Sequence, residues 1–193
     1  PHDPTEGQFS FRGIVRMMAS RDFKDAGYNW VAIDSLTELS DRLIEHLEEE
    51  HKNSSNGFAM WQDYNRLMIG SLKWVRDLPY HVIVTCLAKE EDDANGVTNY
   101  WPMVKGKGVS KQLPGLFDHV LCGVRVSEQA EDRKPPKVMR YIVSDEVSGW
   151  HGKVRDPHRR IKAFERCDDV TELLERMNQE PDAWEDLDDT PTK

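Results

Sequence analysis

The 193-residue chain lacks several features that would assign a protein to a class at once. No run of about 18 apolar residues is present, so we expect no membrane-spanning helix and no membrane partner. Residues 1–4 are polar and include neither an initiator methionine nor a hydrophobic signal segment. We therefore expect a cytoplasmic protein, and we interpret the chain as a fragment or processed product whose upstream part is absent.

Cysteine is scarce, and its three copies, Cys86, Cys122 and Cys167, are far apart in the sequence. Two of them lie in apolar runs that are typical of strands. A disulfide framework or a zinc site needs cysteines at short, paired spacings. The pattern therefore indicates reduced, buried thiols in a reducing compartment.

Basic residues are outnumbered, which gives a net charge of −9, but the imbalance is local. Residues 167–193 hold ten Asp and Glu against two basic residues, so the rest of the chain is nearly neutral. Residues 151–166 even carry six Lys and Arg against two acids. The acidic composition therefore does not exclude an anionic ligand.

No phosphate-binding loop of the form G-x-x-x-x-G-K-S/T occurs in the chain. A strand that ends in an aspartate, which often accompanies such a loop, is present. Residues 29–34 form an apolar, β-type run, typical of a buried central strand, that ends in Asp34 and is followed by Ser35. Open parallel sheets bind ligands at the carboxyl ends of their strands. A carboxylate there can hold Mg²⁺ beside a phosphate, as the Walker B aspartate does. The alternative is that Asp34 simply caps the next helix.

A second apolar run, residues 81–88, reads HVIVTCLA and is rich in β-branched residues. Two amphipathic helices, predicted over residues 36–50 and 58–77, separate it from the first run, which favours a parallel pairing of the two strands. Thr85 then lies near the carboxyl end of the second strand. Its hydroxyl could orient an attacking water or sense a γ-phosphate, or the residue could serve strand propensity alone.

Outside this crossover the patterns are weaker. A helix is predicted over residues 9–21, and residues 89–116 are predicted to form a long polar loop. Lys105, Lys107 and Lys111 lie in that loop among glycines. They favour a basic loop that grips a nucleic-acid backbone, with a merely solvated loop as the alternative.

The C-terminal third predicts a hairpin and then a tail. Residues 118–126 and 138–144 read as antiparallel strands. Lys153 and Arg155 follow in a compact basic element that could reach a phosphate or could be ordinary surface charge. We predict a core over residues 1–166, and a short helix near 169–179 followed by a disordered acidic end in the remainder. That end either binds a partner or shields a basic surface from DNA.

The order of these segments resembles the phage-encoded RecA-like AAA-type ATPases of the single-strand annealing and recombination group. The resemblance covers about residues 10–160 and rests on the segments VAIDSLTEL, LPYHVIVTCLAKEE, YWPMVKGKGVSKQLPGLFDHVLCG, RYIVSD and GWHGKVRD. It implies an α/β fold: an N-terminally truncated RecA-like P-loop NTPase core with a mostly parallel central sheet and a C-terminal β-hairpin.

The same resemblance implies ATP and Mg²⁺ as cofactors. Asp34 then coordinates the metal, Ser35 and Thr85 lie at the nucleotide, and Lys153 and Arg155 approach the nucleotide of a neighbour. It further implies a homo-oligomer that acts on single-stranded DNA in phage recombination or replication, in the cytoplasm of the host cell. Because the Walker A element is missing, we expect this chain alone to be inactive.

Two other functions stay open. The chain could be a non-catalytic DNA-binding or annealing module that has lost the nucleotide site, and an upstream glycine-rich GKT or GKS element would argue against this. It could also be a metal-dependent nuclease that uses Asp34, a second acid and Lys153. Glu38 is a poor candidate for that second acid, because it lies one helical turn into the next element.

Overall fold

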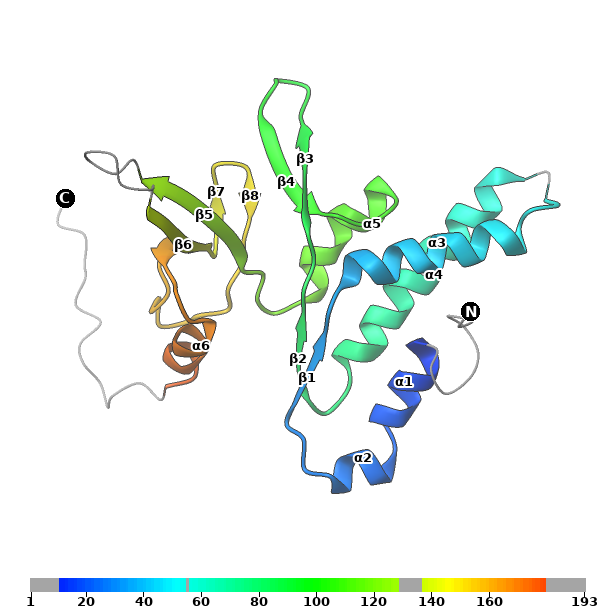
Figure 1. The fold of residues 1–193 in the computed structure, drawn as a ribbon, viewed down its shortest axis with the longest axis horizontal. Coiled ribbons are helices and arrows are strands. Elements are labelled where there is room, and N and C mark those ends of the chain that lie inside the picture. Colours follow the sequence, from blue (N-terminus) through cyan, green and yellow to red (C-terminus); the bar gives the residue numbers. More distant parts are fainter. Residues whose placement is uncertain (1–10, 55, 129–136, 180–193) are drawn as a thin grey trace. The chain divides into compact units, whose positions relative to one another are not determined.

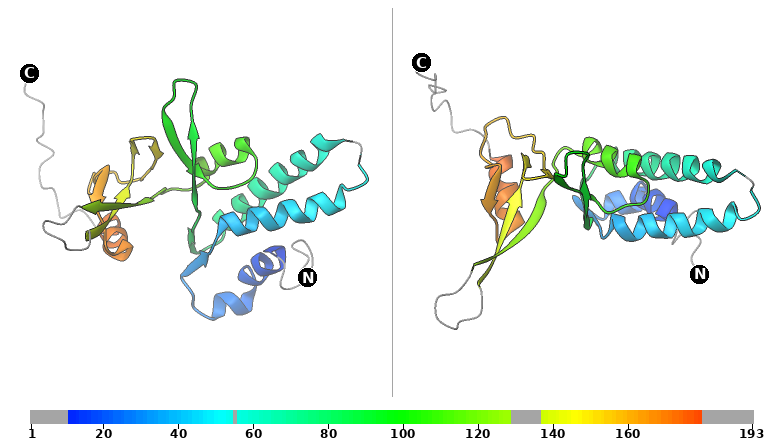
Figure 2. Two further views of the ribbon diagram at one scale, coloured as in Figure 1. Left: turned by 45° about the horizontal axis from the view of Figure 1, so that its top comes forward. Right: turned by 90° about the horizontal axis from the view of Figure 1, so that it is seen from above.

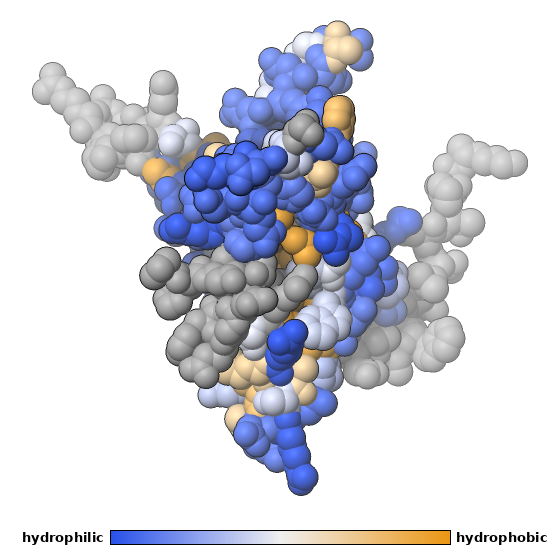
Figure 3. Space-filling model, turned by 90° about the vertical axis from the view of Figure 1, so that its right-hand side faces the viewer, coloured by the Kyte–Doolittle hydropathy of each residue, from blue (hydrophilic) through white to orange (hydrophobic). Residues whose placement is uncertain are grey.

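The computed structural model describes residues 11–54, 56–128 and 137–179, and the chain forms two compact units, Pro1–Phe117 and Asp118–Lys193 (Figure 1). No helix among these described residues is long and apolar enough to cross a lipid bilayer. Figure 3 shows hydrophilic residues over most of the visible face, with hydrophobic ones confined to small areas. The division predicted from the sequence, into a core over residues 1–166 and a tail over residues 167–193, is of a different kind and stays a prediction.

The first unit is organised by one strand–helix–helix–strand crossover. Strand β1 (Trp30–Ile33) pairs in parallel with β2 (His81–Val84), with Trp30 opposite His81 and Ile33 opposite Val84. Helices α3 (Leu36–Glu50) and α4 (Gly57–Arg76) connect the two strands and run side by side (Figures 1 and 2). This confirms the predicted crossover.

Both connecting helices begin at a capping side chain. Ser35 accepts a hydrogen bond from the backbone N–H of Glu38, and Asn56 accepts one from that of Phe58. Apolar residues at helical spacing then pack the two helices together and meet residues from farther along the chain. The core of this unit consists of Leu36, Ile44, Leu47, Tyr64, Met68, Leu72, Val104, Val109 and Leu113.

The predicted helix over residues 9–21 is instead two helices, α1 (Phe11–Met18) and α2 (Arg21–Asp25), and its first two residues lie outside the described ones. The break occurs because the Ser20 hydroxyl accepts from the N–H of Phe23 and so caps a new helix. From α1, Val15 and Met18 pack with α4 against one face of the two-stranded sheet.

The other face of this sheet is open. Trp30 and Ile83 are 47% and 41% exposed, and Ala32 and His81 are exposed beside them. The expectation of a buried central strand is therefore wrong for that face. Among the described residues the parallel pairing also stops at two strands, so the sheets are small and mixed and do not form the predicted, mostly parallel central sheet.

The predicted loop over residues 89–116 is wrong, because this segment folds. Strands β3 (Ala88–Asp92) and β4 (Thr98–Pro102) form an antiparallel hairpin. Its turn is fixed by Asp93, whose carboxylate accepts from the N–H groups of Asn95 and Val97. Helix α5 (Lys107–Gln112) and the 3₁₀ helix η1 (Leu113–Leu116) follow and supply Val109 and Leu113 to the core.

The second unit contains a three-stranded antiparallel sheet in the order β5–β6–β9. Its strands are β5 (Cys122–Glu128), β6 (Lys137–Val143) and β9 (Phe164–Arg166), which confirms the predicted hairpin with a first strand that starts later. A short hairpin, β7 (Glu146–Val147) with β8 (Trp150–His151), lies between β6 and β9 in the chain.

Helix α6 (Val170–Asn178) confirms the predicted helix near residue 169 and covers part of this sheet (Figure 2). Its Leu173 packs with Ile142 and Ile161 in a small core. The predicted acidic end lies outside the described residues.

Candidate nucleotide site

The candidate site is a carboxylate–hydroxyl pair at the carboxyl ends of the two parallel strands. Asp34 directly follows β1 and Thr85 directly follows β2, and both are exposed to solvent. The Thr85 hydroxyl donates a hydrogen bond of 2.5 Å to Asp34 Oδ1. The sequence placed both residues at this edge of the sheet, and the structure brings them into contact.

Backbone hydrogen bonds fix the start of α3 at this edge. The N–H of Leu36 donates to the carbonyl of Thr85 at 2.8 Å, and the N–H of Thr85 donates to the carbonyl of Ile33 at 3.0 Å. The positive end of the α3 dipole therefore lies beside Asp34. The Ser35 oxygen accepts the capping bond, and its hydroxyl proton stays available to donate.

Two neighbours of the pair were missed by the sequence reasoning. The Thr37 oxygen lies 3.4 Å from the Cys86 sulfur and accepts a 3.1 Å hydrogen bond from the N–H of Leu87. Cys86 is an exposed residue, which corrects the expectation of a buried thiol here, but the neighbouring atoms partly desolvate its sulfur and raise the pKa of the thiol, so this sulfur is a neutral group at physiological pH. A signal was present, since Thr37 lies one turn after Asp34 and Cys86 follows Thr85.

The three lysines of the predicted basic loop lie on and just before α5, and each is engaged with its own chain. The Lys105 ammonium is 3.2 Å from Asp41, and Lys107 forms an ion pair with Glu91. Lys111 lies over the Trp101 ring, 5.3 Å from its centroid. The segment is thus a folded element, although the proposed role of these lysines in DNA binding stays a prediction.

A buried polar cluster fixes the position of Lys105. The Ser40 and Tyr64 oxygens are 2.7 Å apart, and the backbone N–H of Lys105 donates to the Ser40 oxygen at 2.8 Å. Burial raises the pKa of Tyr64, so its hydroxyl stays protonated. The chain then turns at Gly106, where φ is +74° and the Tyr64 ring is close.

Lys153 and Arg155 belong to the second unit, where both are bonded to the segment that precedes β5. The backbone of Lys153 pairs with Val120 in both directions, at 2.6 and 2.9 Å. Arg155 forms a 2.9 Å ion pair with Asp118, and its backbone N–H donates to the His119 ring. Their predicted approach to a nucleotide stays a prediction.

The donors around Asp34 suit a metal ion that arrives with a phosphate better than a resident metal. No group of three or more His, Cys, Asp or Glu side chains that could hold a metal occurs among the described residues. Mg²⁺ commonly keeps several waters and uses one or two carboxylates together with substrate phosphates. Asp34 with the Ser35 and Thr85 hydroxyls fits that requirement.

The nuclease alternative requires a second carboxylate beside Asp34. Glu38 does not fill this place, since it is bound to Arg42 at 2.8 Å on the surface of α3. Glu38 is therefore not a second carboxylate beside Asp34.

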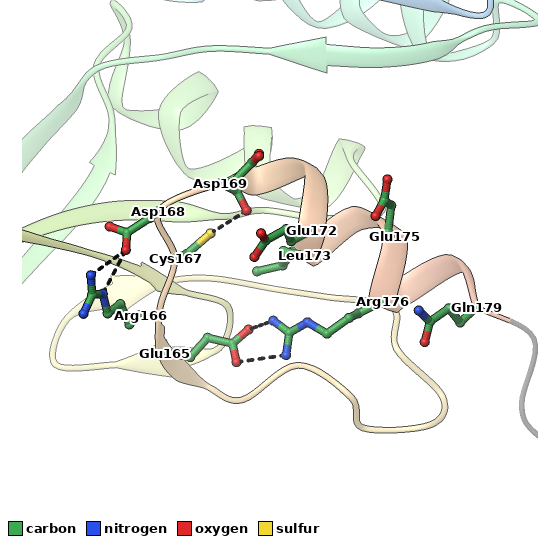
Figure 4. A pocket seen from close by; sticks show the side chains of 10 residues that line it. All are labelled: Glu165, Arg166, Cys167, Asp168, Asp169, Glu172, Leu173, Glu175, Arg176 and Gln179. Atoms are coloured by element: carbon green, nitrogen blue, oxygen red, sulfur yellow. Dashed lines mark hydrogen bonds and ion pairs between the residues drawn. The ribbon is translucent and has the colours of Figure 1, made fainter.

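An acidic concave surface in the second unit lies between β9 and α6 (Figure 4). Its charges are mostly used internally. Arg176 binds Glu165 at 2.5 Å, Arg166 binds Asp168 at 2.7 Å, and Asp169 caps α6 through the N–H of Thr171. These charged groups therefore serve mainly to hold α6 and the segment before it in place.

A crossover of parallel strands with a carboxylate at its edge is the arrangement that nucleotide-hydrolysing α/β proteins use. Residues 4–155 match the AAA domain family, so the chain belongs to this family of P-loop AAA-type ATPases. An AAA domain binds ATP, typically with Mg²⁺, and hydrolyses it. No curated protein and no solved structure matches the chain.

Proposed function

We propose that this chain is part of a RecA-like ATPase core in which Asp34 and Thr85 act at the γ-phosphate end of ATP. The contact between these two side chains carries the proposal, because it joins a carboxylate and a hydroxyl at the ligand-binding edge of parallel strands. Family membership supports ATP as the ligand.

In this proposal hydrolysis is an in-line attack by water on the γ-phosphate. Asp34 would supply the anionic group that holds Mg²⁺, and the Ser35 hydroxyl would donate toward the phosphate oxygens. Thr85 keeps Asp34 oriented and offers its oxygen to the attacking water. Lys153 and Arg155 from a neighbouring copy neutralise the charge that develops.

The phosphate-binding loop has to come from outside these 193 residues, because the sequence holds no such motif. The β1–β2 sheet has an open face, and the outer edge of β2 is unpaired among the described residues. Both could be covered by the segment that carries the loop. Parallel strands are normally paired on both edges and covered on both faces. We infer that a further parallel strand beside β2 ends in this loop, and that its helix covers Trp30 and Ile83.

We also propose that the ATPase acts on single-stranded DNA as a homo-oligomer, in phage recombination or replication. The resemblance of the segment order to that group supports this step. A DNA-binding module without nucleotide chemistry is the alternative. Turnover of ATP by the protein that carries the phosphate-binding loop separates the two.

The test is Asp34→Asn in that extended protein, with ATP turnover and binding of Mg²⁺-nucleotide as readouts. We expect turnover to fall at least about 100-fold, because the metal loses its anionic anchor, while the melting temperature stays the same. Glu38→Gln is the matched control, since it removes a carboxylate one turn away and should leave turnover intact. Turnover that survives in Asp34→Asn would refute the proposal.

A further inference from the structure

The β5–β6 hairpin places two arginines directly opposite each other. Arg125 on β5 is the cross-strand partner of Arg140 on β6, and both are exposed. Side chains in such pairs have Cβ atoms about 4.5–5.5 Å apart, and two like charges in this position repel each other. Within the described residues, neither guanidinium has an ion pair or hydrogen bond to relieve the repulsion.

The other arginines around this sheet show that the second unit usually pairs its guanidinium groups. Arg155 binds Asp118, Arg166 binds Asp168, and Arg176 binds Glu165. Arg160 donates to the carbonyl of Arg176 at the end of α6. Arg125 and Arg140 therefore stand out as two adjacent cations on a rigid strand pair.

The surroundings of the pair leave room for a ligand. On the same face, the neighbouring pairs of β5 and β6 are Gly123 with Ile142 and Ser127 with Val138, none of which is charged. On β9, Glu165 lies opposite Ile142, and its carboxylate is bound by Arg176. Val138 is 54% exposed, and Ile142 is covered by α6. The arginine pair thus lies beyond the covered part of the sheet, beside a small residue and an exposed apolar side chain.

We propose that Arg125 and Arg140 clamp the phosphodiester backbone of single-stranded DNA. Each phosphodiester carries one negative charge on two non-bridging oxygens, so two adjacent guanidinium groups can bind successive phosphates of one strand. Exposed guanidinium planes and Val138 also suit unstacked bases and sugars. The proposal deepens the DNA role proposed above and is independent of the chemistry at Asp34.

Two adjacent cations favour a ligand with two adjacent negative charges. In this chain one carboxylate is satisfied by one arginine, as with Glu165 and Arg176. Each phosphodiester likewise carries one charge on two non-bridging oxygens, so Arg125 and Arg140, which pair with no acid among the described residues, are matched by two successive phosphates of one strand. An acidic peptide, including the chain's own residues 180–193, is the competing ligand that the test has to separate.

The test is fluorescence anisotropy of a labelled oligothymidylate with the 193-residue chain and its Arg125→Ala/Arg140→Ala variant, over a salt series without nucleotide. We expect the variant to bind at least about tenfold more weakly. Its plot of log affinity against log salt should be shallower by about 0.7 for each phosphate that the protein no longer neutralises. Removing the repulsion should leave the melting temperature unchanged or higher.

Lys137→Ala/Lys162→Ala is the charge-matched control, because both lysines are exposed in the same unit. Lys137 lies on the opposite face of β6 from Arg140, and Lys162 lies outside the β5–β6 hairpin. It should keep the salt slope of the parent chain. Arg125→Lys/Arg140→Lys should keep the salt slope but bind more weakly, since lysine cannot make the bidentate contact. An unchanged affinity and slope in the alanine variant would overturn the proposal.

Two further measurements identify the ligand. If the parent chain binds a labelled polyglutamate peptide or inorganic phosphate through this pair but not the oligonucleotide, the proposal is also overturned. The DNA-binding assay contains no nucleotide, so its result does not depend on ATP turnover. The proposal for Arg125 and Arg140 can therefore fail while the proposal for Asp34 holds, and the reverse is also possible.

Discussion

Replacement of Ser40 by alanine tests how strongly α3 holds the segment between β4 and α5. Ser40 is fully buried, and its oxygen serves two groups, the Tyr64 hydroxyl at 2.7 Å and the Lys105 N–H at 2.8 Å. The alanine variant removes this oxygen from both groups in the core. Each buried polar group that loses its partner costs about 1–3 kcal/mol, so we expect a loss of about 2–6 kcal/mol of unfolding free energy.

Two other variants calibrate this expectation. Tyr64→Phe removes one hydroxyl but leaves the bond between Ser40 and Lys105, so we expect a loss of about 1 kcal/mol. Ser110→Ala removes one buried hydroxyl that donates to the carbonyl of Pro102 at 2.7 Å, and its loss should be similar. The large effect of Ser40→Ala is therefore a property of its two hydrogen bonds rather than of any buried serine.

The assay is urea unfolding of the full chain, followed by far-ultraviolet circular dichroism, whose signal comes largely from α3 and α4. Hydrogen exchange at the amide of Lys105 gives a local readout, and this amide should exchange faster in Ser40→Ala. A loss below about 0.5 kcal/mol, or an effect no larger than that of Ser110→Ala, would show that the cluster does not hold the segment.

Two further predictions concern the second unit. Gly152→Ala should lower the free energy of unfolding in urea by about 1–3 kcal/mol or more, because the added Cβ would lie 2.6 Å from the backbone N of Asp145. Gly123→Ala is the control and should change it little, because its Cβ would meet no atom within 4 Å. Burial raises the pKa of Cys122 to about 11, so its alkylation in the folded chain should stay slow until the pH approaches that value. Since the unfolded thiol ionises near its ordinary pKa of 9, the contribution of Cys122 to stability should be complete below pH 9 and lost as the pH rises toward 11. Rapid alkylation of the folded chain at pH 8 would contradict the burial of this thiol.

The sequence was sufficient for the crossover that carries the candidate site. Long periodic helices and two β-branched runs are strong signals, and their order alone predicts a parallel pair with Asp34 and Thr85 at one edge. The contact between these two side chains follows from that topology. The pairing of Asp34 with a hydroxyl, rather than with a second acid, could be read from residue types.

Other features could not be read in this way. The β3–β4 hairpin was missed because residues 89–92 are all charged, which hides the alternation that marks a strand. The state of the three lysines depends on partners such as Asp41 and Glu91, which are distant in the sequence. The juxtaposition of Arg125 and Arg140 depends on strand register, which a hairpin's sequence does not define when its turn is long.

Helix α3 connects the candidate site at the carboxyl ends of β1 and β2 to the segment that follows the β3–β4 hairpin. Helix α3 starts at Leu36, which is bonded to the Thr85 carbonyl, and four residues later Ser40 holds the N–H of Lys105. That distance is about 6 Å along a rigid helix axis. Any displacement of the start of α3 would therefore be transmitted through the hydrogen bond of Ser40 to the segment between β4 and α5.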